Sequence, residues 1–243
     1  SEDGEDGEAK ASGSNSPYES PVRSRQVPVS TLGSRYSVTE AFPVYVQFLA
    51  SAHVAEDFEA LIEEEEEEDY FTPAVKSVEA RVCSLREAVR SNVWVPDFID
   101  LVSSYPFMRS YDSPETTAKC SACRRTNDKC ASELALEGPR YNAKDLWCGP
   151  CAENYPNSDT EGKGPEPVRV GKSCIQRTRI FHDLTHYKFN LLRETRHRIE
   201  RTRDINPHAD DAALIEAVLN ETWVQTLQDK FTKMVEEAEK FRR

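Results

Sequence analysis

Six of the seven cysteines lie between positions 120 and 174, and two pairs of them have the spacing of metal ligands. Cys120 and Cys123 form one Cys-x-x-Cys pair, and Cys148 and Cys151 form the other. Two thiolates three positions apart can both reach one ion, as in zinc knuckles. An odd number of cysteines in a chain rich in Glu and Lys suits metal binding in a reducing compartment better than a disulfide framework. The cysteines therefore predict a zinc site.

Two sets of four ligands are compatible with these residues. The first set combines the two pairs, although the spacer between them is longer than is usual in a zinc ribbon. The second set keeps the first pair and adds Cys130 and Cys174. In that arrangement a strand over 129–137 pairs antiparallel with one over 168–173, so that Cys174 returns beside Cys130. Four protein ligands leave no open coordination position, which predicts structural rather than catalytic zinc.

Two further patterns suggest enzymatic chemistry. The run from Trp147 to Cys151 matches the thioredoxin active-site pentapeptide, which needs a strand before it and a helix after it. Pro156 and a turn-rich run follow it instead. His182 and His186 are one helical turn apart, but Asp-Leu-Thr separates them rather than the Glu-x-x of a zinc protease. We expect their ring N–H groups to support the zinc hairpin by bonding a carbonyl or a cysteine sulfur, and we predict that the chain is not a redox or hydrolytic enzyme.

Helices must position these residues. After Thr72 and Pro73, which suit a helix start, apolar residues recur at helical spacing: Val75, Val78, Val82, Leu85 and Val89. Similar stripes predict helices over 175–203 and 210–241. The fold class is therefore mainly α with a small β-hairpin (α+β), a helical domain over 39–243 stapled by zinc through a hairpin at 118–175. The Ser-, Gly-, Glu- and Pro-rich residues 1–38 predict a disordered arm.

Composition bounds the remaining classes. The 243 residues are 38% hydrophobic and 30% charged, with a formal net charge of −12. No apolar run approaches the ~20 residues that a membrane helix needs. The chain begins with Ser rather than Met, which predicts a fragment of a longer protein.

Charge is unevenly distributed along the chain. Residues 168–203 contain ten Lys or Arg and three Asp or Glu, a net of +7 that leaves −19 elsewhere. Such a helix could lie along a phosphate backbone or an acidic partner, or it could pair with the acidic run 63–68 of its own chain. No base-reading motif accompanies it, so any nucleic-acid binding is expected to be weakly specific and salt-dependent. The candidate contacts are Arg177, Arg179, Lys188, Arg193, Arg196, Arg198 and Arg201.

One stretch resembles a known family. The Cys120 pair, Gly138-x-x-Tyr141 and the run from Gly171 to Lys188 are similar to the C-terminal domain of coiled-coil domain-containing protein 82, in the domain of unknown function 4211 family. The resemblance extends over about 42–203. It implies that Cys120, Cys123, Cys130 and Cys174 are the zinc ligands and that the second Cys-x-x-Cys pair is an addition. It also implies a nuclear, chromatin-associated module that binds chromatin proteins or DNA. The alternatives are a purely structural subunit of a larger complex and a thiol-disulfide oxidoreductase that acts through Cys148 and Cys151.

Overall fold

The structure is a computed structural model that describes residues 37–54, 58, 65–116, 118–126, 130–143 and 164–241. Three predictions fall outside these residues: the disordered arm as far as residue 36, the side chains of the acidic run 63–68, and the Cys148–Cys151 pair. The described helices are α1 (Val38–Val54), α3 (Glu65–Val89), α4 (Pro96–Ser104), α6 (Lys172–Thr185), α7 (Tyr187–Ile205), α8 (Asp211–Val218) and α9 (Glu221–Glu239). The strands are β1 (Phe107–Thr116), β2 (Cys130–Glu137) and β3 (Val168–Gly171).

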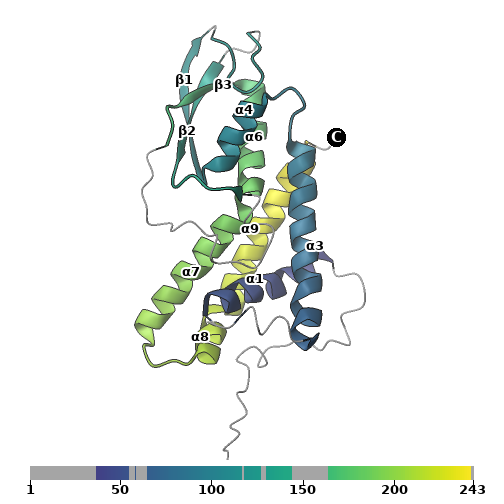
Figure 1. Cartoon of the computed structure of the whole chain (residues 1–243), viewed down its shortest axis with the longest axis vertical. Helices are drawn as coiled ribbons and strands as arrows, with labels where there is room; N and C mark the ends of the chain where they lie inside the picture. The colour runs from purple at the N-terminus through teal and green to yellow at the C-terminus, as the bar shows by residue number, and fades with distance from the viewer. Residues whose placement is uncertain are drawn as a thin grey trace, which may run out of the picture.

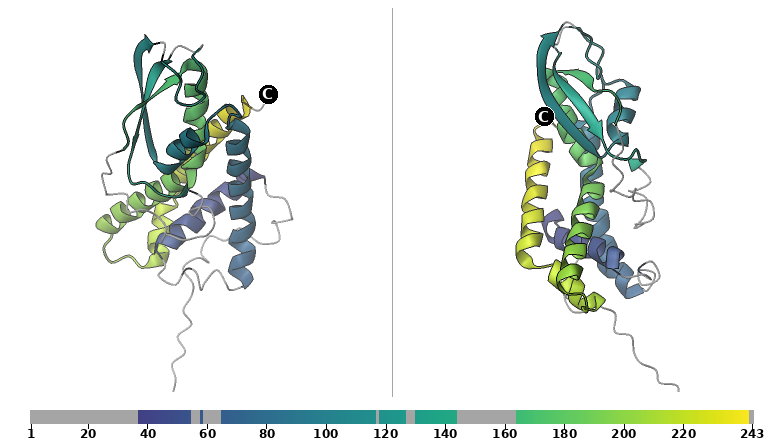
Figure 2. Two further views of the ribbon diagram at one scale, coloured as in Figure 1. Left: turned by 45° about the horizontal axis from the view of Figure 1, so that its top comes forward. Right: turned by 90° about the vertical axis from the view of Figure 1, so that its left-hand side faces the viewer.

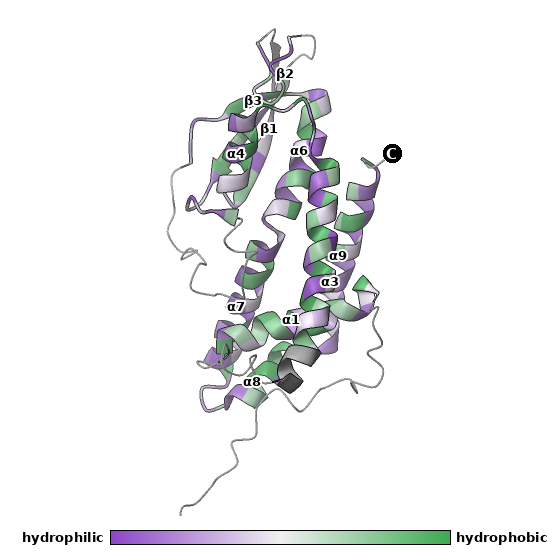
Figure 3. Cartoon of the chain, turned by 45° about the vertical axis from the view of Figure 1, so that its right-hand side comes forward, coloured by the Kyte–Doolittle hydropathy of each residue, from purple (hydrophilic) through white to green (hydrophobic). Residues whose placement is uncertain are grey.

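The molecule is elongated, with the sheet and α4 at one end and α1 and α8 at the other (Figure 1). The long helices α3, α6, α7 and α9 connect the two ends, and α9 runs beside the α6–α7 pair (Figure 2). Hydrophobic and hydrophilic residues alternate along these helices (Figure 3). That pattern is typical of helices that bury one face and expose the other.

A small antiparallel sheet of order β1-β2-β3 carries the cysteines. Strands β2 and β3 pair as predicted, with Cys130 opposite Gly171 and Leu134 opposite Val168. Strand β1 was not predicted, and it extends the expected hairpin to three strands. Its sequence is largely polar and contains Pro114, which an edge strand tolerates because one side of its backbone needs no partner. The fold is mostly helical with this three-stranded sheet, and is therefore α+β.

Two predicted helices are each divided in two. The predicted 175–203 helix is α6 followed by α7, with a break at His186, whose φ of −100° and ψ of 12° are not helical. The predicted 210–241 helix is α8 followed by α9, and each has its own N-cap. Asp210 accepts from the backbone N–H of the third residue after it at 2.8 Å, and Asn220 does the same at 2.9 Å. These caps satisfy backbone donors at both starts.

The helix predicted to start at Thr72 begins earlier. Helix α3 starts at Glu65 and carries Pro73 in its interior, so the predicted start is wrong. Tyr70 and Phe71, each 1% exposed, extend its buried stripe upstream and hold the additional turns against α1. Across the described residues, the buried apolar side chains form one cluster that includes residues of the sheet and of both helical ends. None of the described helices is both long enough and apolar enough to cross a bilayer.

Candidate metal centre

Three cysteine sulfurs converge where the sheet meets α6. The Sγ atoms of Cys120, Cys123 and Cys174 all lie within 4.8 Å of one another. Cys120 and Cys174 are buried, and Cys123 is partly exposed. The first two come from the turn between β1 and β2, whereas Cys174 lies in the first turn of α6. The three residues are therefore close enough to bind a metal ion together.

Backbone hydrogen bonds shape the turn that carries the first pair. The N–H of Arg124 donates to the carbonyl of Cys120 at 2.8 Å, and Arg124 adopts a positive φ of 60° that closes the turn. The N–H of Ser121 donates to Arg169 of β3 at 2.9 Å, and Val95 at the start of α4 donates to the Ala122 carbonyl at 2.8 Å. The turn is thus fixed to β3 on one side and to the entry of α4 on the other.

Donors around Cys120 favour a thiolate there. The pKa of Cys120 is lowered to about 5, chiefly because the Cys174 thiol donates to its sulfur, with backbone N–H groups of Gly171, Cys123 and Ala122 adding to the effect. The Gly171 N–H lies 3.3 Å from the sulfur. The same thiol–thiolate bond raises the pKa of Cys174, and burial raises it further. Convergent N–H groups on a cysteine sulfur are the surroundings that a metal-bound thiolate requires.

Trp94 supplies a further donor. Its indole nitrogen is buried and has no hydrogen-bond partner of normal geometry among the described residues. The indole acts on the Cys174 sulfur, where it lowers the thiol pKa against the larger raising effects. A sulfur with full thiolate charge would be a stronger acceptor for this N–H. The site therefore fits a cation that converts both buried thiols to thiolates.

Cys130, the predicted fourth ligand, lies next to this group but is not one of the three. Its Sγ donates to the carbonyl of Ala118 at 3.4 Å. Its strand partner Gly171 is the residue whose N–H bonds the Cys120 sulfur. Cys130 is buried and remains a predicted ligand.

His182 lies near the end of α6, and His186 directly follows that helix. Neither histidine belongs to the group of described residues that could hold a metal. Each donates its Nε2–H to a carbonyl near the end of α4: His182 to Tyr105 at 2.9 Å and His186 to Val102 at 3.0 Å. The Tyr141 hydroxyl donates to the other ring nitrogen of His186. Burial lowers the pKa of His182 to about 4 and that of His186 to about 3, so both rings are neutral near pH 7. They join α6 to α4 through carbonyls, and their bonds do not include a cysteine sulfur.

The predicted basic helix does not present one continuous charged face. Arg177 and Arg193 lie over the rings of Phe241 and Phe107, at 5.3 and 4.4 Å from the ring centroids. Arg179 donates to the Ser110 hydroxyl on β1. These residues bind the helix to α9 and to the sheet.

Nearer the end of α7, three more arginines differ in their surroundings. Arg196 forms an ion pair with Glu200 at 2.9 Å. Arg198 lies 4.9 Å from the Trp223 ring centroid, and Arg201 is exposed. Exposed arginines therefore occur at separate positions of both helices, with Arg179 on α6 and Arg201 on α7.

Lys188 is not available to a partner, so this part of the prediction is wrong. Its side chain is 2% exposed, and its Nζ lies 2.7 Å from Oε1 of Glu79 on α3. The Tyr45 hydroxyl of α1 donates to the same carboxylate oxygen at 3.3 Å. Because Glu79 is distant in sequence from the basic run, no local pattern could have identified this pair.

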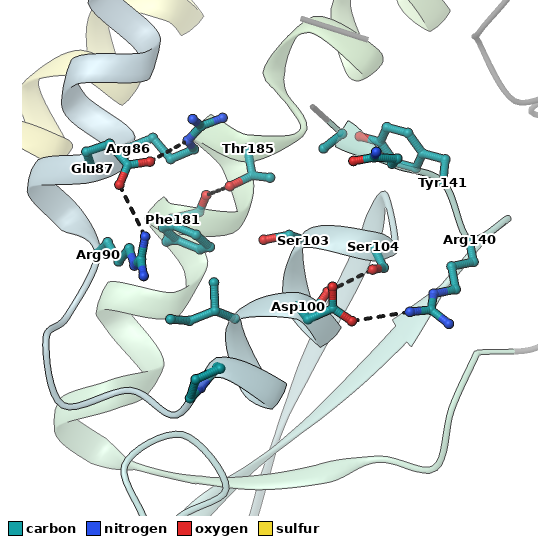
Figure 4. Close-up of a pocket in the computed structure, with 14 residues that line it drawn as sticks. Arg86, Glu87, Arg90, Asp100, Ser103, Ser104, Arg140, Tyr141, Phe181 and Thr185 are labelled. Carbon is teal, nitrogen blue, oxygen red and sulfur yellow. Dashed lines mark hydrogen bonds and ion pairs between the residues drawn. The ribbon is translucent and has the colours of Figure 1, made fainter. Parts of the chain in front are cut away.

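A pocket of about 750 Å³ lies between α3, α4, α6 and the segment 140–143 (Figure 4). Arg86, Arg90 and Arg140 surround it, and the carboxylates of Glu87 and Asp100 pair with them. The C-terminal ends of three helices meet here, and cations are favourable at such ends. The arginines therefore offset the partial negative charge of these helix ends and pair with the two carboxylates.

Comparison with known proteins places the chain in a family. The family model described as "Domain of unknown function (DUF4211)" matches residues 2–146, a range that includes three of the four predicted ligands and ends before Cys174. The fission yeast (Schizosaccharomyces pombe, strain 972) protein named "Uncharacterized protein C17H9.06c" is 23% identical over 152 residues, which make up 58% of this chain and 24% of that protein. The chain thus matches about a quarter of that relative's length. No solved structure matches significantly. The family model covers more than half of the chain, so the chain belongs to the DUF4211 family.

Proposed function

We propose that this member of the DUF4211 family is a zinc-stapled binding module of the nucleus, which contacts chromatin proteins or DNA and has no catalytic role. The observation that carries the metal part is the meeting of Cys120, Cys123 and Cys174 within 4.8 Å. In tetrahedral thiolate zinc the Zn–S distance is about 2.3 Å, so the sulfurs stand about 3.8 Å apart. Small side-chain rotations would bring the three sulfurs to that spacing.

Cys130 is the proposed fourth ligand. It starts β2 opposite Gly171, which itself bonds the Cys120 sulfur, so Cys130 lies beside the three clustered residues. Its Sγ would exchange the bond to the Ala118 carbonyl for the ion. With four thiolates the ion would have no open position and would act structurally. It would connect the sheet, the start of α6 and, through Ala122, the start of α4.

The metal proposal is tested by exchange of the native ion for Co²⁺. Absorption of the Co²⁺ form reports both tetrahedral geometry and the number of thiolates. We expect one metal ion per chain, a four-thiolate spectrum in the wild type, and a three-thiolate spectrum in Cys130→Ser. Cys83→Ser is the matched control, because Cys83 lies on α3 away from the cluster. Folded, reduced protein without bound zinc would refute the metal proposal, and an unchanged Cys130→Ser spectrum would remove Cys130 from the ligand set.

The nuclear and chromatin parts rest on the likeness to the C-terminal domain of coiled-coil domain-containing protein 82. A fluorescent fusion of the chain is expected in the nucleus and in the chromatin fraction, from which added salt releases it. Arg179→Glu/Arg196→Glu should weaken this retention, whereas Lys233→Glu/Lys240→Glu, with the same change in charge on exposed positions of the C-terminal helical region, should not. A fusion that stays outside the nucleus, or retention insensitive to salt, would contradict the proposal.

A further inference from the structure

A groove runs between α7 and α9. Two adjoining pockets, of about 450 and 230 Å³, form it and share Glu194. The α7 residues that line it follow helical spacing from Tyr187 to Ile205, and those of α9 do so from Trp223 to Met234. At 1.5 Å per residue these stretches extend about 27 and 16 Å. The groove is therefore long enough to hold several turns of a third helix.

The floor of this groove is apolar. Leu191 and Leu227 line the smaller pocket, and Trp223 lines the larger one. Ile205 stands at its edge with 76% of its surface exposed, the largest exposed fraction among the large apolar residues that the structure describes. Leu191 and Leu227 are buried, whereas Tyr187 and Met234 in the smaller pocket and Trp223 in the larger one are partly exposed. Partly exposed apolar side chains in both pockets are suited to receive anchor residues from an amphipathic helix.

The charges at the larger pocket are positive and not neutralised. Arg198 donates to the Val218 carbonyl and lies over Trp223, and Arg201 is exposed. Neither has a carboxylate partner among the described residues. Burial lowers the pKa of Arg198, and repulsion from Arg201 lowers it further. The nearby carboxylate of Glu194 is already paired with Lys230 at 2.8 Å. A carboxylate supplied from outside would relieve the repulsion between the two guanidinium groups.

We propose that this groove binds an acidic amphipathic helix of a partner protein, with apolar anchors on Tyr187, Trp223 and Met234 and carboxylates beside Arg198 and Arg201. This inference rests on the binding function proposed above and names its partner class. A peptide fits better than duplex DNA, because apolar side chains of a peptide can fill the two hollows, whereas a phosphate backbone would leave their apolar lining exposed to water.

Two displayed peptide libraries of about 16 residues, a length set by the groove, test the proposal. Both have apolar residues at i, i+3, i+4 and i+7, and they differ only in drawing the other positions from Asp, Glu and Ser or from Lys, Arg and Ser. We expect the intact chain to enrich the acidic library. The affinity of the best peptides, measured by fluorescence anisotropy, should fall at least about ten-fold for Arg198→Glu/Arg201→Glu.

The control variant Arg203→Glu/Lys233→Glu changes the charge equally at exposed positions outside the groove, and should change affinity by less than about three-fold. Arg201→Glu alone, at an exposed position, keeps the test valid if the double variant is misfolded by circular dichroism. Enrichment of the basic library, equal losses in both variants, or loss of duplex DNA binding without any peptide binding would overturn the proposal. The Co²⁺ spectra and the Arg179→Glu/Arg196→Glu fractionation change residues outside this groove, so a failure of the proposed function is distinguishable from a failure of peptide binding.

Discussion

Replacement of Lys188 by Met is expected to be among the most destabilising single changes in the molecule. Met retains the length of the aliphatic stem but removes the ammonium group 2.7 Å from Glu79. The two side chains are 2% and 15% exposed, so the carboxylate of Glu79 would stay buried with only the Tyr45 hydroxyl known to donate to it. Breaking a buried ion pair by removing one partner costs about 3–5 kcal/mol. For a folded unit of this size, that corresponds to a fall in Tm of about 6–20 °C.

The loss should depend on pH in a defined direction. Burial already raises the pKa of Glu79, and Lys188 opposes that rise. Without Lys188 the folded-state pKa rises further above the unfolded value. A raised carboxyl pKa stabilises the folded state below the unfolded pKa, and this contribution is lost as pH rises through the folded pKa. The deficit of Lys188→Met should therefore shrink as pH falls from 7 toward 5.

Urea unfolding followed by tryptophan fluorescence at several pH values measures both effects. The double variant Glu79→Gln/Lys188→Met removes the unpaired charge, and it should recover most of the lost free energy of unfolding. A loss below about 1 kcal/mol for Lys188→Met, or a double variant no more stable than the single one, would refute the reasoning about the buried pair.

Three other changes have expected outcomes. Cys174→Ser should lower the bound metal, measured by elemental analysis, below one ion per chain. It should also reduce the thermal stability of the sheet end, measured by calorimetry with and without chelator; unchanged metal content would contradict the role of Cys174 as a ligand. Wild-type protein should lose stability as pH falls below about 6.5, because burial depresses the folded-state pKa of His182 to about 4 and the unfolded chain then binds the proton first. His182→Gln should flatten this slope by about 0.5 proton at pH 6.5 and about 0.9 proton at pH 5.5 in urea titrations, and an equal slope would count against the neutral ring. Asn220→Ala should cost about 1 kcal/mol by removing the cap of α9, whereas Asn220→Asp, which keeps the acceptor, should cost little in the same assay.

The sequence predicted the parts of the fold that depend on local chemistry. The pairing of 129–137 with 168–173 followed from strand patterns that return Cys174 toward the Cys120 pair, and the structure confirms that pairing. The long helical stripes were also visible, because apolar residues recur every three or four positions. Asn220, a typical N-cap residue, indicates that a second helix starts there. The apolar stripe continues across it, and for that reason a single helix over 210–241 was predicted.

Other features depend on contacts between distant segments, and no local pattern encodes them. Strand β1 is an edge strand of mixed polarity, so its formation depends on β2 more than on its own residues. Lys188 was grouped with the surface arginines because its neighbours in sequence are basic, whereas its burial is set by Glu79 on another helix. His186 interrupts a long helix without Pro or Gly, and its ring bonds Val102 and Tyr141, which lie far away in sequence.

The course of α3 has a consequence for how the molecule unfolds. Near its start Phe71 packs against Phe48 of α1, and at its end the chain turns through Trp94, whose ring lies 5.5 Å from that of Phe181 on α6. Helix α3 thus leads into the hydrophobic core at both ends of the molecule. Neither end has a complete core of its own, so neither is expected to fold alone. A scanning calorimeter should record one heat-absorption peak for the whole molecule, and proteolytic halves should not persist as folded fragments.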